Sequence, residues 1–531
     1  MNSTYLLHEL ISASAKRMPN QVALSHGGTS LSYDSLAASV GQFASGLRYI
    51  GLARFERVGI YLEKRLETVI ASFGTTLAGG VFVPLNPILK PEQVAYILRD
   101  CGIRVLVTSP ERYALLASAL TDCPDLRHIV LTGDTAPSSD AAIAGIAWND
   151  LLAAPKTSGH RVIDSDMAAI LYTSGSTGKP KGVVLSHRNL VAGAKSVSSY
   201  LENSSDDTIL AALPLSFDAG FSQLTTAFHV GARAVLINYL LPKDVLNAVV
   251  KERVTGLTAV PPLWIQMSQL AWPASVTEHL RYIANTGGRM PAETLKALRS
   301  NLPRTRPYLM YGLTEAFRST YLPPDEVDRR PDSIGKAIPN AEILVLREDG
   351  TPCAPNEPGE LVHRGALVGM GYWNDPEKTA ERYKPLPVGV GGQEAGLVLP
   401  EIAVFSGDNV RMDEDGFLYF IGRRDEMIKS SGYRISPTEV EEILYATQLV
   451  GEVAAFGVPH PVLGQAIVAI ATPRPGQQLS ADELLIASRP HFPAFMIPAR
   501  IDIRNGSLPR NPNGKIDRKL LSVDFTNLFE E

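Results

Sequence analysis

The sequence predicts an α/β protein with a large N-terminal domain of two helix-covered sheets plus a small β-barrel, followed by a small α+β C-terminal domain. Its 531 residues are too many for one hydrophobic core, so at least two domains are expected. Short apolar runs alternate with helical patterns up to about residue 340, as in parallel sheets covered by helices. From about residue 341 short strands and turns take over, and a separate β/α alternation follows residue 422.

The first unit, about residues 1–165, alternates helices and strands. Helices are expected over residues 6–17, 33–51 and 67–78, and strands over residues 29–33, 58–62 and 81–85. Parallel strands need a crossover connection, commonly a helix, so this alternation predicts the first helix-covered sheet.

The second unit, about residues 166–340, continues the alternation. It opens with an apolar strand at residues 167–171, and Ser186 is placed to cap the helix that follows a glycine-rich loop. Polar segments follow later strands, at residues 217–218, 285–288 and 311–315. Ligands of such sheets gather at the carboxyl ends of the strands, so these segments are candidates for a binding site.

The third unit, about residues 341–422, has short strands with turns and suggests the small β-barrel. Its strands are expected at residues 342–346, 359–363 and 416–420. The remaining residues, 423–531, form the separate C-terminal unit of mixed β and α character.

The composition bounds the partners and the cellular location. The net charge is −5 and no basic tract is present, so nothing favours nucleic-acid binding. Three widely spaced cysteines fit neither a zinc site nor a disulfide framework. The first residues lack the pattern of a signal peptide, and no apolar run approaches membrane-spanning length. We therefore expect a cytoplasmic protein without a membrane span.

A glycine-rich loop at residues 172–182 separates two apolar strands. Glycines let backbone N–H groups approach a phosphate, hydroxyls add donors, and lysines add positive charge. The candidate phosphate ligands are Thr173, Ser174, Gly175, Ser176, Thr177, Gly178, Lys179 and Lys181. The loop is not a Walker A loop, because Gly175 and Gly178 are three apart and Pro180 follows the first lysine. The alternative is a flexible polar linker, which seldom places lysines beside glycines between two apolar runs.

The loop sequence YTSGSTGKPKG resembles the phosphate loop of the adenylate-forming superfamily, which includes acyl- and aryl-CoA ligases, non-ribosomal peptide adenylation domains and luciferases. Further motifs of that family follow along nearly the whole chain: NTGG at 285–288, YGLTE at 311–315, SGD at 406–408, GRRDEMIK at 422–429 and NGKIDR at 513–518. The resemblance implies an AMP-binding domain over residues 1–422 and a mobile lid domain over residues 423–531.

By this resemblance the nucleotide ligands of the N-terminal domain can be assigned. Tyr311 stacks on adenine, Thr314 contacts phosphate, Glu315 holds Mg²⁺, and Asp408 accepts hydrogen bonds from the ribose. Further ATP- or AMP-binding positions are Thr286, Gly287, Gly288 and Gly312. A carboxylate suits Mg²⁺, which prefers oxygen ligands and bridges phosphates.

The resemblance also assigns residues of the lid. Arg423 reaches the ribose or the α-phosphate, and Asp425 is the hinge about which the lid turns. Gly432 and Tyr433 lie where the lid faces the thiol. Lys515 is the adenylation lysine, and a mobile point charge suits it because charge develops on the carboxylate and the α-phosphate. The predicted catalytic residues are thus Lys515, Thr314, Glu315 and Arg423.

The implied reaction is an ATP-dependent, AMP-forming activation of a carboxylic acid with transfer to a thiol, as in acyl-CoA ligases. Its cofactors and co-substrates are ATP, Mg²⁺, and either coenzyme A or the phosphopantetheine of a separate carrier protein. The alternative is a stand-alone enzyme that adenylates an amino acid such as proline and loads a carrier protein in trans. Residues 223–228 are similar both to prolyl-carrier-protein ligases and to exosortase-associated acyl ligases. A non-catalytic nucleotide binder is disfavoured by the intact Lys515.

The acid is less well defined. Matching to the family places the substrate pocket at Phe217, Asp218, Ala219, Ala259, Met310 and Arg318. Asp218 favours a substrate with a cationic group, such as an amino acid, or it only caps the helix that follows. Arg318 binds a second carboxylate, or it neutralises Asp218 and leaves a neutral acyl pocket.

Overall fold

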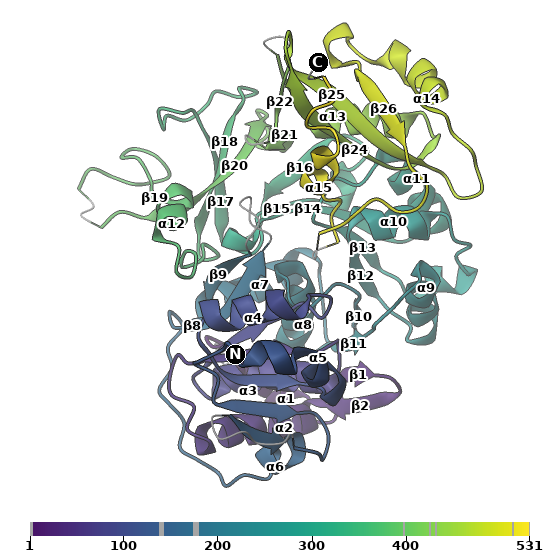
Figure 1. Cartoon of the computed structure of the whole chain (residues 1–531). Coiled ribbons are helices and arrows are strands. Elements are labelled where there is room, and N and C mark those ends of the chain that lie inside the picture. The colour runs from purple at the N-terminus through teal and green to yellow at the C-terminus, as the bar shows by residue number, and fades with distance from the viewer. Residues whose placement is uncertain are drawn as a thin grey trace.

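The computed structural model describes residues 4–136, 143–173, 180–396, 399–423, 426–430, 433–511 and 514–529. Three sheets organise the described chain, with seven, fourteen and five strands (Figure 1). Helices cover the two larger sheets, as the sequence predicts. No helix in these ranges has both the length and the apolar character that crossing a membrane requires.

The seven-stranded sheet has the order β7-β6-β5-β3-β4-β8-β9. Its strands are β3 (Arg57–Tyr61), β4 (Val81–Pro84), β5 (Ile103–Thr108), β6 (His128–Leu131), β7 (Ala144–Ala147), β8 (Met167–Thr173) and β9 (Lys181–Ser186). The strands pair in parallel except for the antiparallel hairpin of β8 and β9. β3 after Arg57 and the whole of β4 are buried and carry no charged side chain, because both faces of the sheet are covered.

The fourteen-stranded sheet has a parallel centre that is extended on both sides. The parallel strands are β1 (Val22–His26), β10 (Thr208–Ala211), β11 (Arg233–Leu236), β12 (Gly256–Ala259), β13 (Tyr282–Asn285) and β14 (Arg306–Tyr311). The strand β2 (Thr29–Ser32) pairs with β1, and β15 (Thr320–Leu322) pairs with β14. Because β1 joins this sheet while β8 and β9 join the other, each sheet takes strands from both sides of residue 165.

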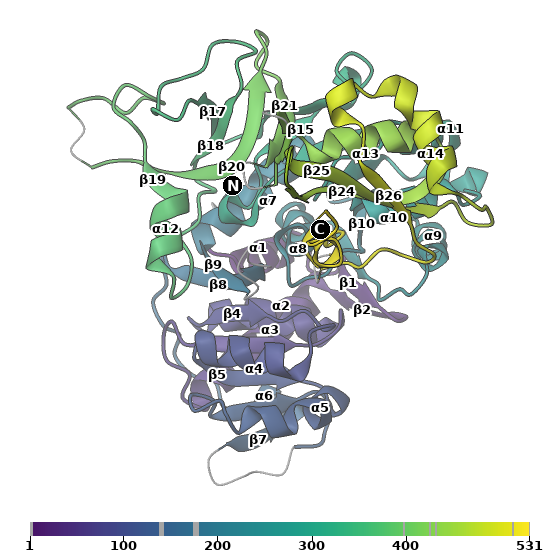
Figure 2. The same cartoon turned by 45° about the horizontal axis from the view of Figure 1, so that its top comes forward.

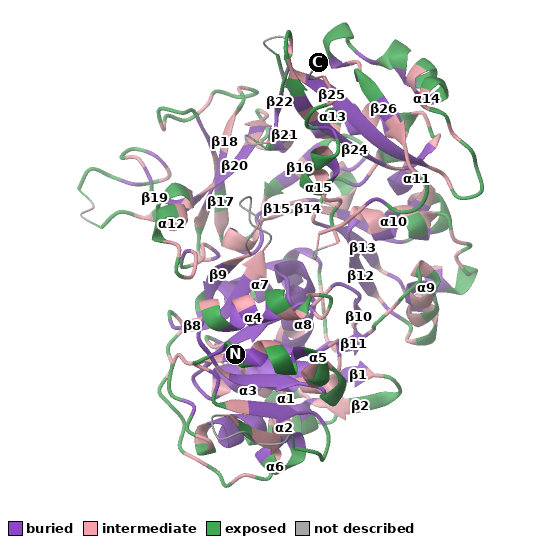
Figure 3. Cartoon of the chain, in the orientation of Figure 1, coloured by how far each residue is buried: buried purple, intermediate pink, exposed green. Residues whose placement is uncertain are grey.

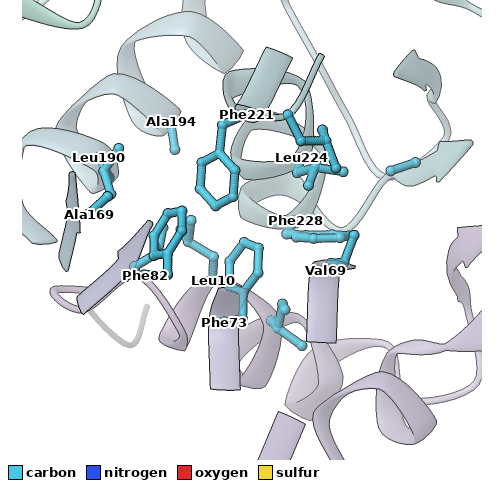
Figure 4. Close-up of a cluster of buried hydrophobic side chains, with 14 of the residues drawn as sticks. Leu10, Val69, Phe73, Phe82, Ala169, Leu190, Ala194, Phe221, Leu224 and Phe228 are labelled. Atoms are coloured by element: carbon cyan, nitrogen blue, oxygen red, sulfur yellow. The ribbon is translucent and has the colours of Figure 1, made fainter. Parts of the chain in front are cut away.

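Helices fill the space between the two large sheets. They include α1 (Glu9–Arg17), α2 (Tyr33–Tyr49), α3 (Leu66–Leu77), α7 (His187–Tyr200) and α8 (Asp218–Val230). Phe73 of α3 and Phe82 of β4 pack against Phe221 of α8, with ring centroids 5.6 and 4.8 Å apart (Figure 4). Aromatic burial of this kind is a large part of core stability. It fixes α8, whose first residue is the candidate pocket residue Asp218.

The predicted small β-barrel is not closed among the described strands. The strands β17 (Ala341–Leu346), β18 (Gly359–Gly365), β20 (Ile402–Met412) and β21 (Leu418–Arg423) pair antiparallel in that order. At one end β21 pairs with β16 (Ser333–Ala337), which pairs with β15, so these strands continue the fourteen-stranded sheet. β19 (Tyr383–Pro385) adds to β20. The sheet stays open because β21 is already paired with β16 and β17 forms the free edge.

The C-terminal sheet has the order β23-β22-β25-β24, with β26 beside β25. The strands are β22 (Ile428–Ser430), β23 (Tyr433–Ile435), β24 (Val450–His460), β25 (Gly464–Pro473) and β26 (Arg500–Ile503). The helices α13 (Pro437–Ala446), α14 (Ala481–Ser488) and α15 (Arg518–Val523) pack with it. This unit lies over α10 (Pro261–Ser268) and α11 (Ala292–Asn301) in both views (Figures 1 and 2).

The remaining elements complete the cover of the sheets. They are α4 (Pro91–Asp100), α5 (Pro110–Leu120), α6 (Trp148–Leu152), α9 (Pro242–Lys251), α12 (Pro376–Arg382) and the short 3₁₀ turns η1 (Ala274–Glu278), η2 (Thr314–Ala316), η3 (Pro324–Glu326), η4 (Arg489–His491) and η5 (Ala494–Met496). Buried residues gather in the sheets and along the inward faces of the helices (Figure 3).

Candidate active site

The β8–β9 hairpin holds both ends of the glycine-rich loop. Thr173 pairs with Lys181 across the hairpin, and the Thr173 hydroxyl lies 3.5 Å from the Lys181 carbonyl. The intervening Ser174, Gly175, Ser176, Thr177, Gly178 and Lys179 lie outside the described residues. Ser186 accepts a hydrogen bond from the Asn189 amide at 3.2 Å, so the predicted cap of α7 is confirmed. The hairpin thus brings Thr173 and Lys181 together at the edge of the sheet.

A tyrosine that the sequence did not single out connects this loop to Glu315. The Tyr372 hydroxyl donates to Glu315 Oε1 at 2.6 Å, and its ring lies 5.8 Å from Lys181 Nζ. The backbone holds this arrangement, because the Gly369 amide donates to the Glu315 carbonyl at 2.8 Å. Tyr372 stands between a glycine and a tryptophan in a loop, a setting that by itself carries no functional signal.

The Glu315 carboxylate is placed so that it could bind a metal cation that also binds phosphate oxygens. Its carboxylate is partly exposed and has an oxygen beyond the one that accepts from Tyr372. No cluster of three or more His, Cys, Asp or Glu side chains that could hold a metal occurs in the described part of the chain. A Mg²⁺ ion that phosphate oxygens and waters largely coordinate needs few protein ligands, and the Glu315 carboxylate could serve as one.

A second polar group lies where β14, β20 and β21 meet. The Tyr311 hydroxyl donates to Asp408 Oδ2 at 2.5 Å, and Arg423 Nε donates to Asp408 Oδ1 at 3.1 Å. Asp408 is largely buried, and this burial raises the pKa of its carboxyl while the Arg423 charge opposes the shift. A buried carboxylate with two donors is held in one orientation, as an acceptor for two neighbouring hydroxyls requires.

The segment after β13 places Gly287 beside Lys515, the predicted adenylation lysine. Gly287 has a positive φ of 77°, which favours glycine, and a Cβ atom built there would lie 3.5 Å from Lys515 Cε. The Asn285 side chain donates to the Gly288 carbonyl at 2.7 Å, and the Thr286 amide donates to the Ala259 carbonyl at 3.1 Å. The Lys515 side chain therefore extends from the C-terminal unit to the strand ends of the fourteen-stranded sheet.

A tight turn presents Lys515. The Asn511 amide donates to the Lys515 carbonyl at 2.8 Å, and Arg510 and Glu452 form an ion pair that ties the turn to β24. Lys515 keeps solvent exposure, yet protein surrounds its side chain closely enough that desolvation lowers its pKa. The positive charge of Arg423 acts in the same direction, whereas Asp218 and Asp408 oppose it. Lys515 thus lies within electrostatic reach of Asp408 and Arg423 on one side and of Asp218 on the other.

Contacts between the units hold this pose. Arg289, which follows the NTGG segment, forms an ion pair with Glu442 of α13 and another with Asp332. The Gln448 side chain donates to Glu293 at 3.2 Å. Within the C-terminal unit Arg518 pairs with Glu441 at 2.7 Å, which ties the end of the chain to α13.

We expect docking of the C-terminal unit to weaken as the pH rises towards about 7. Burial raises the pKa of Glu442 from 4.5 to about 7, and the opposing charge of Arg289 does not cancel this. If Glu442 of the free unit keeps its ordinary pKa of 4.5, the docked state binds the proton more tightly, so docking weakens as the pH rises from about 4.5 to about 7 and changes little above that. Energy transfer between dyes on the two units measures this dependence.

The variant Glu442→Gln should remove most of this pH dependence, whereas Glu483→Gln, at an exposed position of α14 in the same unit, should retain it. The same pH profile in the parent protein and in Glu442→Gln would contradict this expectation.

The predicted acyl-pocket residues are buried together near the start of α8. Asp218 does not cap this helix, because Phe217 occupies the cap position without a side-chain cap hydrogen bond. Arg318 Nη1 lies 3.8 Å from Asp218 Oδ2 and 3.4 Å from the Thr286 hydroxyl. Burial raises the pKa of Asp218, while the charge of Arg318 opposes the shift. The other predicted lining residues, Phe217, Ala219, Ala259 and Met310, are also buried.

The turn after Glu315 sets the direction of Arg318. Phe317 has a positive φ of 56° and is fully buried, and a Cβ atom on Gly193 of α7 would lie 2.4 Å from its ring. Strain of this kind persists only where the surrounding packing holds it. Replacement of Gly193 by alanine would therefore displace Phe317 and, through it, Arg318.

The predicted thiol-side and hinge residues fall at the start of the C-terminal unit. Tyr433 is exposed, and its ring stacks on Phe495 with centroids 4.1 Å apart. Gly432 and Asp425 lie outside the described residues. Thr314 and Gly312 are partly exposed beside Tyr311 and Glu315. Apart from Tyr433, the described site residues lie around the ends of β8, β13 and β14.

Comparison with known proteins places this arrangement in a family. The pattern of AMP-binding enzymes matches residues 11–373, and that of the AMP-binding enzyme C-terminal domain matches residues 439–515. The chain belongs to the AMP-binding enzyme family. This membership confirms the predicted superfamily, and with it the class of AMP-forming acid–thiol ligases of the acyl-CoA synthetase type.

The relatives match along nearly the whole chain. A feruloyl-CoA synthase of an Amycolatopsis species is 32% identical, over 94% of this chain and 95% of its own length. Tyrocidine synthase 3 of Brevibacillus parabrevis is 29% identical over 97% of this chain, which is 8% of that protein. The fold matches ATP-bound MatB of Rhodopseudomonas palustris with a TM-score of 0.85 at 24% identity, over 98% of this chain and all of MatB.

Proposed function

We propose that this chain uses Mg-ATP to convert a carboxylic acid into an acyl-adenylate and then transfers the acyl group to coenzyme A. The observation that carries the assignment of residues is the reach of Lys515 to Gly287, at the strand ends where Tyr311 and Asp408 also meet. A lysine from a second unit that points into a nucleotide-binding segment suits adenylation, since negative charge accumulates as pyrophosphate leaves. We assign residues 1–422 to the nucleotide-binding domain and residues 423–531 to a mobile lid.

In the first half-reaction we propose that the large domain binds and positions the nucleotide. Tyr311 provides a face for adenine, and Asp408 accepts from the ribose hydroxyls once Tyr311 and Arg423 release part of its carboxylate. Thr314, Lys181 and the glycine-rich loop bind phosphate oxygens, and Glu315, held by Tyr372, is the protein ligand for Mg²⁺. When bound, Mg²⁺ neutralises phosphate charge. The acid carboxylate lies near Lys515, which aligns it with the α-phosphorus.

In the second half-reaction we propose that the lid turns at Asp425 and withdraws Lys515. The face with Gly432 and Tyr433 then meets the acyl-adenylate, and the thiol sulfur attacks the acyl carbon. The C–O bond to the phosphate breaks, and AMP leaves with that oxygen. Two contacts between the units, Arg289–Glu442 and Gln448–Glu293, are polar and can break and re-form, as such a movement needs.

The acceptor thiol is coenzyme A in this proposal, and a carrier-protein phosphopantetheine is the second candidate. The full-length match to a feruloyl-CoA synthase favours the first. The match to one segment of a tyrocidine synthase, and Asp218 in the pocket, keep amino-acid adenylation as the alternative. We place the enzyme in the cytoplasm, where its three free cysteines would remain reduced.

Acid-dependent exchange of labelled pyrophosphate into ATP tests the proposal. We expect exchange with at least one class among fatty, aryl and amino acids, and release of AMP only when a thiol is added. Coenzyme A and a phosphopantetheinylated carrier protein are supplied in parallel to identify the acceptor. Nucleotide binding without exchange, across all three classes of acid, would reduce the chain to a nucleotide-binding protein.

A further inference from the structure

The buried pair of Asp218 and Arg318 is incompletely satisfied by the described protein. The two residues keep 5% and 3% of their surface exposed. Arg318 Nη1 has only long contacts, 3.8 Å to Asp218 and 3.4 Å to Thr286. Arg318 Nε is buried and has no hydrogen-bond partner among the described residues. A buried guanidinium with so few close acceptors is costly unless another group completes its hydrogen bonds.

The pair lies in the part of the site that would hold the acyl chain. Asp218 begins α8, whose position is fixed by the stacking of Phe221 on Phe73. Arg318 Nη1 lies 3.4 Å from the Thr286 hydroxyl, and the neighbouring Gly287 lies beside Lys515 Cε, so the reacting carboxylate beside Lys515 would also be near this pair. Groups on the acyl chain within reach of the pair are therefore those close to the carboxylate.

The charges of the pair restrict what such a group can be. Asp218 carries one negative charge and Arg318 one positive charge, so a second ionised group on the acid would leave a buried charge unbalanced. An ammonium would satisfy Asp218 but face Arg318, and a carboxylate would satisfy Arg318 but face Asp218. A hydroxyl or an amide both donates and accepts, so it complements the two side chains together.

We propose that the natural acid carries an uncharged hydrogen-bonding group, a hydroxyl or an amide, which binds between Asp218 and Arg318. This inference rests on the function proposed above and specifies its substrate class. The group donates to the Asp218 carboxylate and accepts from the Arg318 guanidinium. Asp218 and Arg318 are thereby specificity-determining residues, and Ala219 and Ala259, which are also predicted to line the pocket, are buried and have small side chains.

Pyrophosphate exchange with matched acids tests this assignment. One series comprises butanoate, 3-hydroxybutanoate, 4-hydroxybutanoate, succinamate, 4-aminobutanoate and succinate, and an aryl series compares benzoate with its hydroxy, carbamoyl, aminomethyl and carboxy derivatives. In at least one series we expect kcat/KM for a hydroxy or amide acid to exceed that of the plain acid at least about tenfold, because buried polar groups left unpaired penalise the plain analogue.

Variants separate a specific role from a structural one. In Arg318→Met and in Asp218→Asn the preference for the polar acid should fall towards unity, whereas Arg329→Met, at an exposed position, should retain it. Circular dichroism and ATP binding establish that each variant is folded.

Each other outcome has a defined meaning. A preference for plain, amino or dicarboxylic acids would overturn the inference and leave the ligase function intact. A preference for hydroxy or amide acids that survives in both Arg318→Met and Asp218→Asn would also overturn it. Absence of exchange with every acid in both series, in a folded protein that binds ATP, would count against the proposed function itself.

Discussion

Replacement of Lys515 by alanine is expected to slow acyl-adenylate formation at least about 100-fold, because one preorganised donor at a developing charge contributes about this much. The side chain reaches Gly287 in the structure, so its loss removes a positive charge from the place where the carboxylate meets the α-phosphate. Thioester formation from supplied acyl-adenylate should be largely spared, since the lid has by then withdrawn this residue. Pyrophosphate exchange and single-turnover thiolysis measure the two halves separately.

The matched control for this lysine is Lys243→Ala, at an exposed position of α9. It should leave both half-reactions unchanged. Equal losses of adenylation and thiolysis in Lys515→Ala would refute the division of labour between two poses of the lid.

Replacement of Glu315 by glutamine should lower the rate of pyrophosphate exchange by about 100-fold, the upper end of the losses seen when a residue that only orients a metal ligand is replaced. The amide keeps the size of the side chain but removes the charge that a hard divalent cation prefers. Raising the Mg²⁺ concentration should recover part of the rate, because the phosphates still hold the ion.

Two further variants are compared with Glu315→Gln, one with a smaller expected loss and one with none. Tyr372→Phe removes only the hydrogen bond that orients Glu315 and should give a smaller loss, of about tenfold or less, with the same response to Mg²⁺. Glu377→Gln, at an exposed position of α12, should behave as the parent protein. If Glu315→Gln kept the full rate at low Mg²⁺, the assignment of Glu315 as a metal ligand would be wrong.

Much of the fold follows from local patterns in the sequence. Buried parallel strands such as β4, and β3 after Arg57, lack charged residues, and α2 and α3 have helical spacing, so their existence is predictable. The β-barrel was not correctly predicted, because a strand's partner depends on contacts distant in sequence. β21 pairs with β16, more than eighty residues away, and local patterns do not specify such a choice.

In the site, too, residues in short motifs could be predicted, whereas contacts between residues distant in the sequence could not. Resemblance to short family motifs predicts Gly287, Glu315 and Asp408 as site residues, because each motif is a contiguous segment of the sequence. Tyr372 escapes such a search, since its role depends on a loop that folds back against η2. The pairing of Asp218 with Arg318 was one of the open alternatives, and only the meeting of α8 with the turn after β14 favours it.

The route of one oxygen atom tests the central claim most directly. The acid is supplied with ¹⁸O in its carboxylate, and the AMP and pyrophosphate formed with ATP and coenzyme A are analysed by mass spectrometry. Attack of the carboxylate on the α-phosphorus, followed by thiolysis at the acyl carbon, leaves one ¹⁸O atom in each AMP and none in pyrophosphate. AMP without the heavy isotope, or the isotope in inorganic phosphate, would contradict an acyl-adenylate and with it the role given to Lys515.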